Sequence, residues 1–291
     1  MALQLRGEGR VREAEVHVRM GLKGAPTFAL GHAILGDLMS GQERWIEAVA
    51  AYRDAVELAP ELVSAWNNMG SAFRALKQYQ DAEASFRRVL HLDPCCAPAW
   101  RNLGLSLVYM NRADEACLCF ERACELVPEN LDYAWTSARS LPIVYADDAQ
   151  KRSYRERYIA GLRGIRHIVD GLSHDSALKA VDDIWDAFHF HYQGEQDRQA
   201  QSLHGELIHA VMAKAYPQLM KPLETVPSSS RRVRVGFVSS MLRKHTITFL
   251  FRGWMEGLDP DVFECFGYQL DGQEDETTAE LSKTMEHFRC L

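Results

Sequence analysis

Residues 63–96 read VSAWNNMGSAFRALKQYQDAEASFRRVLHLDPCC, and residues 97–130 read APAWRNLGLSLVYMNRADEACLCFERACELVPEN. The two stretches share a tryptophan, a glycine, an alanine, a phenylalanine and a proline at the same places, 34 residues apart. A fixed period of this length indicates an array of structural repeats. The positions in phase are Pro26, Pro60, Pro94 and Pro128; Gly36, Gly70 and Gly104; Ala14, Ala48, Ala82 and Ala116; and Tyr52, Phe86 and Phe120.

Each shared position has a packing role in a pair of helices. Gly70 and Ala82 lie where the two helices of one unit touch, because only small side chains allow that approach, while Trp66 and Phe86 fill the space between helices. Pro94 ends the second helix, since proline has no amide hydrogen and clashes with the preceding turn. The pattern resembles the tetratricopeptide repeat, which predicts a mainly α solenoid whose units bury their apolar faces only against their neighbours.

The phase of the repeat sets the expected domain limits. We expect the solenoid to occupy residues 1–142, and its first unit to lack most of its first helix because Met1 falls at the seventh position. The expected units are 1–28 (partial), 29–62, 63–96, 97–130 and 131–142 (partial).

Two asparagines are candidates for binding an extended peptide. Asn68 and Asn102 occupy the sixth position of their units and neither is needed for packing. Their amides can pair with a peptide backbone by one donor and one acceptor bond each, on the concave inner face of the array. The alternative is a solvated polar face. Ile34 and Thr136 stand at the equivalent positions, so an asparagine ladder has only two rungs.

The composition excludes several classes of protein. The chain has 291 residues, 47% of them hydrophobic and 25% charged, with a formal net charge of −7. That mix is typical of a globular protein, and no apolar run approaches the length of a membrane helix. The lack of such a run predicts no membrane partner, and the lack of a basic tract predicts no nucleic-acid partner. Seven cysteines without a secretory signal predict reduced thiols in a cytoplasmic protein.

Residues 143–230 lose the period but remain helical in pattern. A stripe of apolar residues from Tyr154 to Val169 recurs at three- and four-residue steps, which predicts a helical linker. Four histidines raise the question of a metal site, but no acidic or cysteine residue completes a ligand set, so we expect none. The histidines are His189, His191, His204 and His209.

In residues 231–291 the helical pattern gives way to alternating strands and helices. A proline and three serines precede an alternating β-branched segment, which predicts a strand. Strand–helix–strand–helix order predicts the start of an α/β doubly wound parallel sheet. The expected elements are a strand over 232–240, a helix over 250–258, a strand over 263–268 and a helix over 277–288.

In such folds the active site lies beyond the carboxyl ends of the strands. The loop after the first strand places Ser239, Ser240, His245 and Thr246 at that edge, together with two cations. The glycine-rich dinucleotide fingerprint is absent. His245 is a candidate catalytic residue, and a surface histidine is the alternative.

The three segments together resemble the protein O-linked N-acetylglucosamine transferases and their SPINDLY-like relatives, in the bacterial branch. The stretch Val233-Arg-Val-Gly-Phe-Val-Ser-Ser240, with His245 five residues on, carries the resemblance. Phe263-Glu-Cys-Phe-Gly-Tyr268 and Glu286-His-Phe288 follow in the family's order.

The resemblance implies an inverting transfer of a sugar from a UDP-sugar to a Ser or Thr hydroxyl of a protein, without a metal or another cofactor. It implies that the repeat groove binds the acceptor protein or peptide. It gives His245 the role of base or positioning group, and Ser239, Ser240 and Thr246 that of substrate-binding residues. The family's glycosyltransferase B-type fold has two lobes, so we expect residues 1–291 alone to lack a complete UDP site and to be inactive.

Two other functions stay open. One is a non-catalytic repeat scaffold that binds proteins and carries a decayed terminal domain. The other is a doubly wound enzyme of another type, such as a methyltransferase, although the missing glycine-rich loop counts against it. The donor sugar is also open among N-acetylglucosamine, fucose and glucose.

Overall fold

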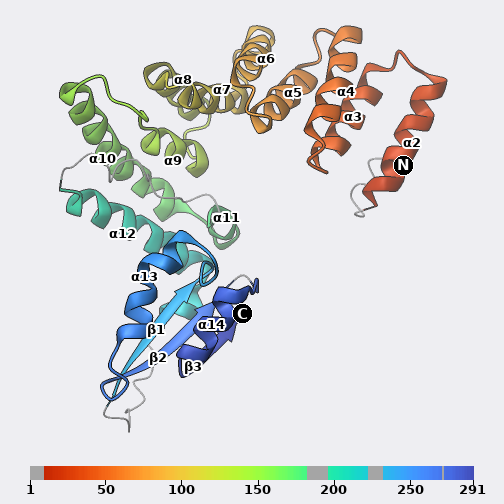
Figure 1. Cartoon of the computed structure of the whole chain (residues 1–291). Coiled ribbons are helices and arrows are strands. Elements are labelled where there is room, and N and C mark those ends of the chain that lie inside the picture. The colour runs from red at the N-terminus through yellow and green to blue at the C-terminus, as the bar shows by residue number, and fades with distance from the viewer. Residues whose placement is uncertain (1–9, 182–195, 222–231, 271) are drawn as a thin grey trace. The chain divides into compact units, whose positions relative to one another are not determined.

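The computed structural model describes residues 10–181, 196–221, 232–270 and 272–291 (Figure 1). The chain divides into two compact units, Met1–Lys221 and Pro222–Leu291. The expected fold class is confirmed, because a mainly α repeat array is followed by a small parallel α/β region. The pair His189 and His191, and the proline–serine break before the first strand, lie outside the described residues.

Helix pairs build the first unit in the order that the 34-residue period predicts. Each pair packs internally, and the second helix of one pair also packs on the first helix of the next. The elements are α2 (Val11–Gly24), α3 (Ala29–Ser40), α4 (Trp45–Leu58), α5 (Val63–Ala75), α6 (Tyr79–Leu92), α7 (Ala97–Tyr109), α8 (Ala113–Leu126) and α9 (Leu131–Arg139).

The turn inside each pair repeats with the same period. Glu43, Lys77 and Asn111 have φ values of 59°, 60° and 57°. This left-handed conformation costs roughly 1–2 kcal/mol for a residue with a side chain. It reverses the chain so that the next amide returns to the first helix: the Gln78 amide donates to the Phe73 carbonyl at 2.9 Å.

The residue at the tryptophan position joins each repeat to the preceding one. Its ring nitrogen reaches the carbonyl oxygen of the proline six residues earlier, which explains why the two residue types share one period. The pairs are Trp66 Nε1 with Pro60 O (3.0 Å), Trp100 Nε1 with Pro94 O (2.9 Å) and His32 Nε2 with Pro26 O (2.8 Å).

The in-phase glycines lie against the in-phase aromatic rings, as the packing argument expects. A Cβ added to Gly70 would meet Phe86 Cε1 at 2.8 Å, and one added to Gly104 would meet Phe120 Cε1 at 2.6 Å. Phe86 and Phe120 are almost completely buried. Only glycine therefore fits at these two points of helix contact.

The helices after the repeats pack on α9 in one hydrophobic core, in which Trp135 is buried. The predicted apolar stripe is confirmed, since Tyr154, Tyr158, Leu162, Ile165 and Val169 are all buried in α10. These helices are α10 (Asp148–Gly171), α11 (His174–Ala180), α12 (Arg198–Ala215) and the 3-10 turn η2 (Pro217–Met220).

The second unit is a three-stranded parallel sheet in the order β1-β2-β3. Leu242, Met255, Leu281 and Met285 form its small core, against which Phe237 and Phe288 pack. The elements are β1 (Val233–Ser239), α13 (Thr246–Gly257), β2 (Phe263–Gln269), α14 (Glu276–Thr284) and β3 (His287–Cys290).

Two of the sequence-based boundaries in this unit are wrong. Helix α13 begins at Thr246, four residues before its expected start, because His245 caps it although histidine is not a favoured capping residue. Helix α14 ends at Thr284, and residues 287–290 form a strand instead of a last helical turn. The open edge of β2 supplies backbone partners for this short segment, and such a tertiary partner leaves no mark in the local sequence pattern.

Candidate functional site

The loop between β1 and α13 lies at the carboxyl end of the parallel strands, where the sequence places the site. Ser239 is the last residue of β1, and its Oγ accepts a hydrogen bond from the Met241 amide at 3.0 Å. The Ser240 carbonyl accepts from Gln269 Nε2 at 2.9 Å. The two predicted serines therefore shape the start of the loop through their own hydrogen bonds.

Residues that sequence reasoning missed hold the rest of this loop. Gln269 ends β2, is fully buried, and accepts from the Leu242 amide through Oε1 at 2.8 Å. Thr278 Oγ1 donates to the Leu242 carbonyl at 2.9 Å. Asp275 accepts from the Lys244 amide at 2.7 Å, and this hydrogen bond is the main cause that lowers the pKa of Asp275.

One of these anchors has a signal in the sequence. Asp275 and Thr278 form a reciprocal capping box at the start of α14, and acidic or hydroxyl residues at this spacing are typical of a helix N-terminus. Gln269 has no such signal, because its partners in this loop, Leu242 and Ser240, are 27 and 29 residues away in the chain. The anchored loop thus has a fixed backbone that presents His245 and Thr246.

The geometry of His245 limits its chemistry. Its Nδ1 accepts a hydrogen bond from the Ile247 amide at 3.2 Å, as the cap of α13. In a neutral imidazole one nitrogen accepts while the other carries the proton, so Nε2 is the hydrogen-bond donor here. Thr246, the first residue of α13, is exposed beside it. The loop therefore offers a hydroxyl and an N–H donor at the positive end of a helix.

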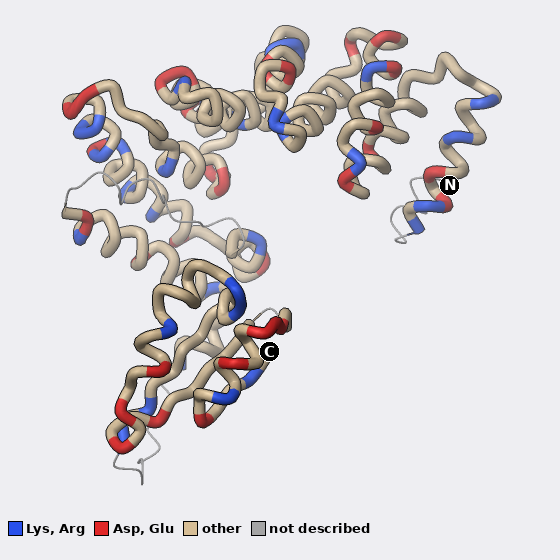
Figure 2. The backbone as a smooth tube through the Cα atoms, viewed as in Figure 1, with Lys and Arg blue, Asp and Glu red and all other residues tan. Residues whose placement is uncertain are grey.

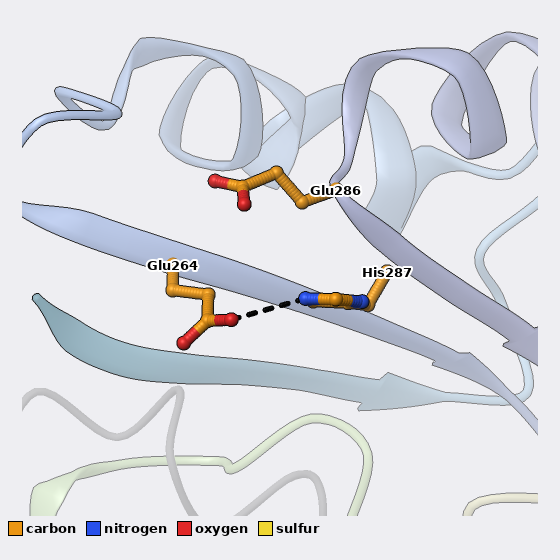
Figure 3. A group of neighbouring side chains, drawn as sticks. All are labelled: Glu264, Glu286 and His287. Atoms are coloured by element: carbon orange, nitrogen blue, oxygen red, sulfur yellow. Dashed lines mark hydrogen bonds and ion pairs between the residues drawn. The ribbon is translucent and has the colours of Figure 1, made fainter. Parts of the chain in front are cut away.

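A second polar group lies on the sheet (Figure 3). Glu264 Oε1 is 3.1 Å from His287 Nε2, and the potential ligand atoms of Glu264, Glu286 and His287 lie within 4.8 Å of one another. Arg232 reaches Glu286 through Nη1 at 2.6 Å and Nη2 at 3.0 Å, and this pairing lowers the pKa of Glu286. Since a guanidinium already neutralises Glu286, the group is an ion-pair network.

The histidines that raised the question of a metal site in the sequence are separate from this network. His204 is buried in the linker core, where its ring lies 5.4 Å from that of Trp135. His209 lies on the same helix, α12. The structure brings neither histidine to a cluster of further potential ligands among the residues it describes.

The two predicted asparagines of the repeats lie in different environments. Asn68 Nδ2 donates to Asp37 Oδ1 at 2.9 Å, and Tyr52 donates its hydroxyl to the same oxygen at 2.7 Å. These residues line a cavity of about 350 Å³ together with Ser71. Asn102 is partly buried on α7, and among the described residues its amide makes no hydrogen bond. The two rungs of the expected ladder are therefore not equivalent.

Comparison with known proteins identifies the repeats. Models of the tetratricopeptide repeat match residues 63–94 and 97–130. A comparison with curated proteins gave no match.

Several solved structures are similar. The MamA protein is 18% identical with a TM-score of 0.53, over 59% of this chain and 91% of that one. PilF of Pseudomonas aeruginosa is 21% identical with a TM-score of 0.51, over 74% and 89%. A mutant O-GlcNAc transferase of Thermobaculum terrenum is 19% identical with a TM-score of 0.44, over 92% of this chain and 42% of that chain.

At these identities the similarity to MamA and PilF shows the fold alone. None of the helices in the described ranges has both the length and the apolar character needed to cross a bilayer. Two tetratricopeptide repeats are matched, and the helix pair before them packs in the same way, so the first unit of the chain contains an array of tetratricopeptide repeats.

Proposed function

We propose that the chain acts in cytoplasmic protein O-glycosylation, in which the repeats bind an acceptor protein and the α/β unit forms one side of a sugar-transfer site. The observation that carries the proposal is the anchored loop after β1, with His245 and Thr246 at the carboxyl edge of a parallel sheet. The motif Val233–Ser240 with its resemblance to the protein O-linked N-acetylglucosamine transferases supplies the reaction class.

In that reaction the acceptor hydroxyl oxygen bonds to the anomeric carbon of a UDP-sugar. The bond from that carbon to the phosphate oxygen breaks, UDP leaves with the electron pair, and the hydroxyl proton passes to a base. His245 presents Nε2–H while Nδ1 is occupied by the Ile247 amide. In this geometry His245 donates a hydrogen bond and positions a substrate oxygen, which favours the positioning role over the role of base.

Two substitutions of His245 test both the proposed sugar transfer and the positioning role of this residue. The full-length protein is incubated with UDP-N-acetylglucosamine and a protein mixture, and sugar on Ser and Thr is measured. His245→Ala is expected to lower the rate roughly a hundredfold, the usual effect of losing one positioned donor. His245→Gln keeps an N–H donor and is expected to retain part of the rate.

Two results would count against this proposal. Equal loss in both variants would favour a base over a donor. Absence of transfer by the wild-type protein, or full activity of His245→Ala, would remove the proposed function itself.

The second candidate function is a non-catalytic protein-binding scaffold. The cavity beside Asp37 and Asn68 on the repeats supports it, since it does not involve the α/β unit. Binding of acceptor peptides without any sugar transfer would favour the scaffold. Asn102→Ala and Asn68→Ala test the groove in either case, and unchanged peptide binding by the double variant would exclude the asparagine ladder.

A further inference from the structure

The junction between α6 and α7 differs from the preceding repeat junction in its side chains. Acidic and basic residues are interspersed along the described helices of the first unit, so charge alone singles out no junction (Figure 2). Cys95 and Cys96 are adjacent here, whereas Glu61 and Leu62 stand at the same positions one repeat earlier. The two cysteines lie between the two matched repeats, so the repeat pattern itself does not require them.

The two thiols differ in their access to solvent. Cys95 is exposed, and Cys96 is half-buried. The Cα atoms of neighbouring residues lie about 3.8 Å apart, so the two thiols remain close neighbours. An oxidant from solvent therefore reaches Cys95 first, and Cys96 is the adjacent thiol that can react with the product.

Hydrogen bonds fix the backbone of this junction. The Cys95 amide donates to Asp93 Oδ1 at 3.0 Å, and the Cys96 amide donates to the Asp93 carbonyl at 3.2 Å. The Cys96 carbonyl accepts from the amides of Ala99 and Trp100 at 3.1 Å and 3.2 Å, as the N-cap of α7. The backbone of Cys96 thus connects the end of α6 to the first turn of α7.

A disulfide between adjacent cysteines disturbs this arrangement. The two Cα atoms of a disulfide usually lie about 4.4–6.8 Å apart, farther than those of neighbouring residues, so closing the ring moves the backbone of Cys95 and Cys96. Because the Cys96 carbonyl holds the first turn of α7, this movement weakens the hydrogen bonds from Ala99 and Trp100. Strained disulfides are also readily reduced again, which is typical of regulatory ones.

The other thiols are less reactive. Of the seven cysteines, all of which lie in described parts of the chain, only Cys95 is exposed. Burial raises the pKa of the Cys119 thiol to about 11, and it also raises the pKa of Cys117, Cys124 and Cys265. The thiolate is the form that reacts with oxidants, so these thiols react more slowly.

We propose that Cys95 and Cys96 are a modification site that hydrogen peroxide converts to a reversible disulfide, which loosens the junction between α6 and α7. The Cys95 sulfur attacks one peroxide oxygen, the O–O bond breaks, and a sulfenic acid and one water form. The Cys96 sulfur then displaces the hydroxyl of the sulfenic acid as a second water, and the S–S bond forms. The two thiols lose two electrons and two protons to the peroxide. This inference does not rest on the proposed sugar transfer.

Mass spectrometry of the full chain treated with hydrogen peroxide tests the chemistry. Trypsin cleaves after Arg88 and Arg101, so both cysteines fall in the peptide 89–101, which contains no other cysteine. After free thiols are blocked with iodoacetamide, this peptide is expected to be unblocked and lighter by two hydrogen atoms, and a reducing agent is expected to restore it. In Cys96→Ser the second thiol is missing, so Cys95 is expected to proceed to the sulfinic acid.

Hydrogen exchange measures the effect on the junction. The amides of Ala99 and Trp100 are expected to exchange roughly fivefold faster after oxidation, the effect of losing about one net hydrogen bond. The junction before α5 is an internal control, because the Leu62 carbonyl accepts from Ala65 and Trp66 at 3.1 Å and 3.3 Å and neither position 61 nor 62 is a cysteine. Exchange at this control junction is expected to stay unchanged.

Several results would overturn the proposal. Persistence of both thiols, a sulfinic acid on Cys95 of the wild-type protein, or a first disulfide elsewhere would remove the modification site. A disulfide with unchanged exchange at Ala99 and Trp100, or equal acceleration at the control junction, would refute the loosening. Cys124→Ser removes a thiol outside the site and is expected to respond as the wild-type protein does; loss of the disulfide in this variant would contradict the pairing.

Discussion

Replacement of Gly104 by alanine tests the packing that sets the repeat. The glycine lies on α7 where α8 crosses it, and an added Cβ would meet Phe120 Cε1 at 2.6 Å, Cζ at 2.8 Å and Cδ1 at 2.9 Å. Carbon atoms prefer separations of about 3.5–4.0 Å, so the ring would have to withdraw by about 1 Å. Phe120 is 1% exposed, and its neighbours leave it little room to move.

Two opposing effects determine the result. Overpacking of a core costs about 1–3 kcal/mol, whereas removing a glycine from a helix stabilises it by about 0.5–1 kcal/mol. The free energy of unfolding of the repeat unit is therefore expected to fall by about 0.5–2 kcal/mol. For a unit of this size, the corresponding drop in the thermal midpoint is roughly 2–6 °C.

Urea unfolding followed by far-UV circular dichroism measures this change, with Gly164→Ala as the matched control. Gly164 lies in α10, and a Cβ there meets nothing within 4 Å, so the same substitution is expected to stabilise the protein.

Phe120→Leu, alone and combined with Gly104→Ala, completes a double-mutant cycle that should show a coupling energy between the two sites. Gly104→Ala as stable as the wild type, or strict additivity in the cycle, would refute the reasoning.

Three further predictions concern single contacts. Trp100→Phe removes the ring N–H that reaches Pro94 and should lower the free energy of unfolding by about 0.5–1.5 kcal/mol in urea titrations; an unchanged midpoint contradicts this. The pKa of Glu115 is lowered from 4.5 by its hydrogen bond to Arg112, so its stabilisation is present above pH 4.5 and is lost as the pH falls through the lower folded pKa. Arg112→Gln should therefore make the free energy of unfolding depend less on pH below pH 4.5. An unchanged dependence on pH in this variant would argue against the pairing of Glu115 with Arg112. Thr278→Val leaves a buried loop carbonyl without its donor, so hydrogen exchange of loop 241–244 should accelerate while that of the β1 core changes little.

The repeat array could be predicted from the sequence because local spacing and tertiary packing agree there. Gly70 faces Phe86, and Trp66 binds Pro60, at positions that the period itself identifies. The left-handed conformation of the turn residues could not be predicted from the sequence, since glutamate and lysine, as at Glu43 and Lys77, do not favour that conformation. These turn residues recur every 34 residues because the chain reverses direction once in each helix pair, whatever side chain stands there.

The candidate site could be predicted only in part. The order of strand, loop and helix indicates where Ser239 and His245 lie, because the carboxyl ends of parallel strands carry the loops that bind ligands. The residues that fix the loop come from β2 and α14, and Gln269 in particular has no local pattern.

The contact between the tryptophan position and the proline before it has an evolutionary consequence. Each repeat provides the donor for the junction behind it and the acceptor for the junction ahead, and His32 provides that donor where tryptophan is absent. A recombination event that removes or duplicates any multiple of 34 residues therefore regenerates every junction that it cuts. Gene duplication can lengthen or shorten such an array in whole units, and the reach of its binding surface can change without any new solution to the folding problem.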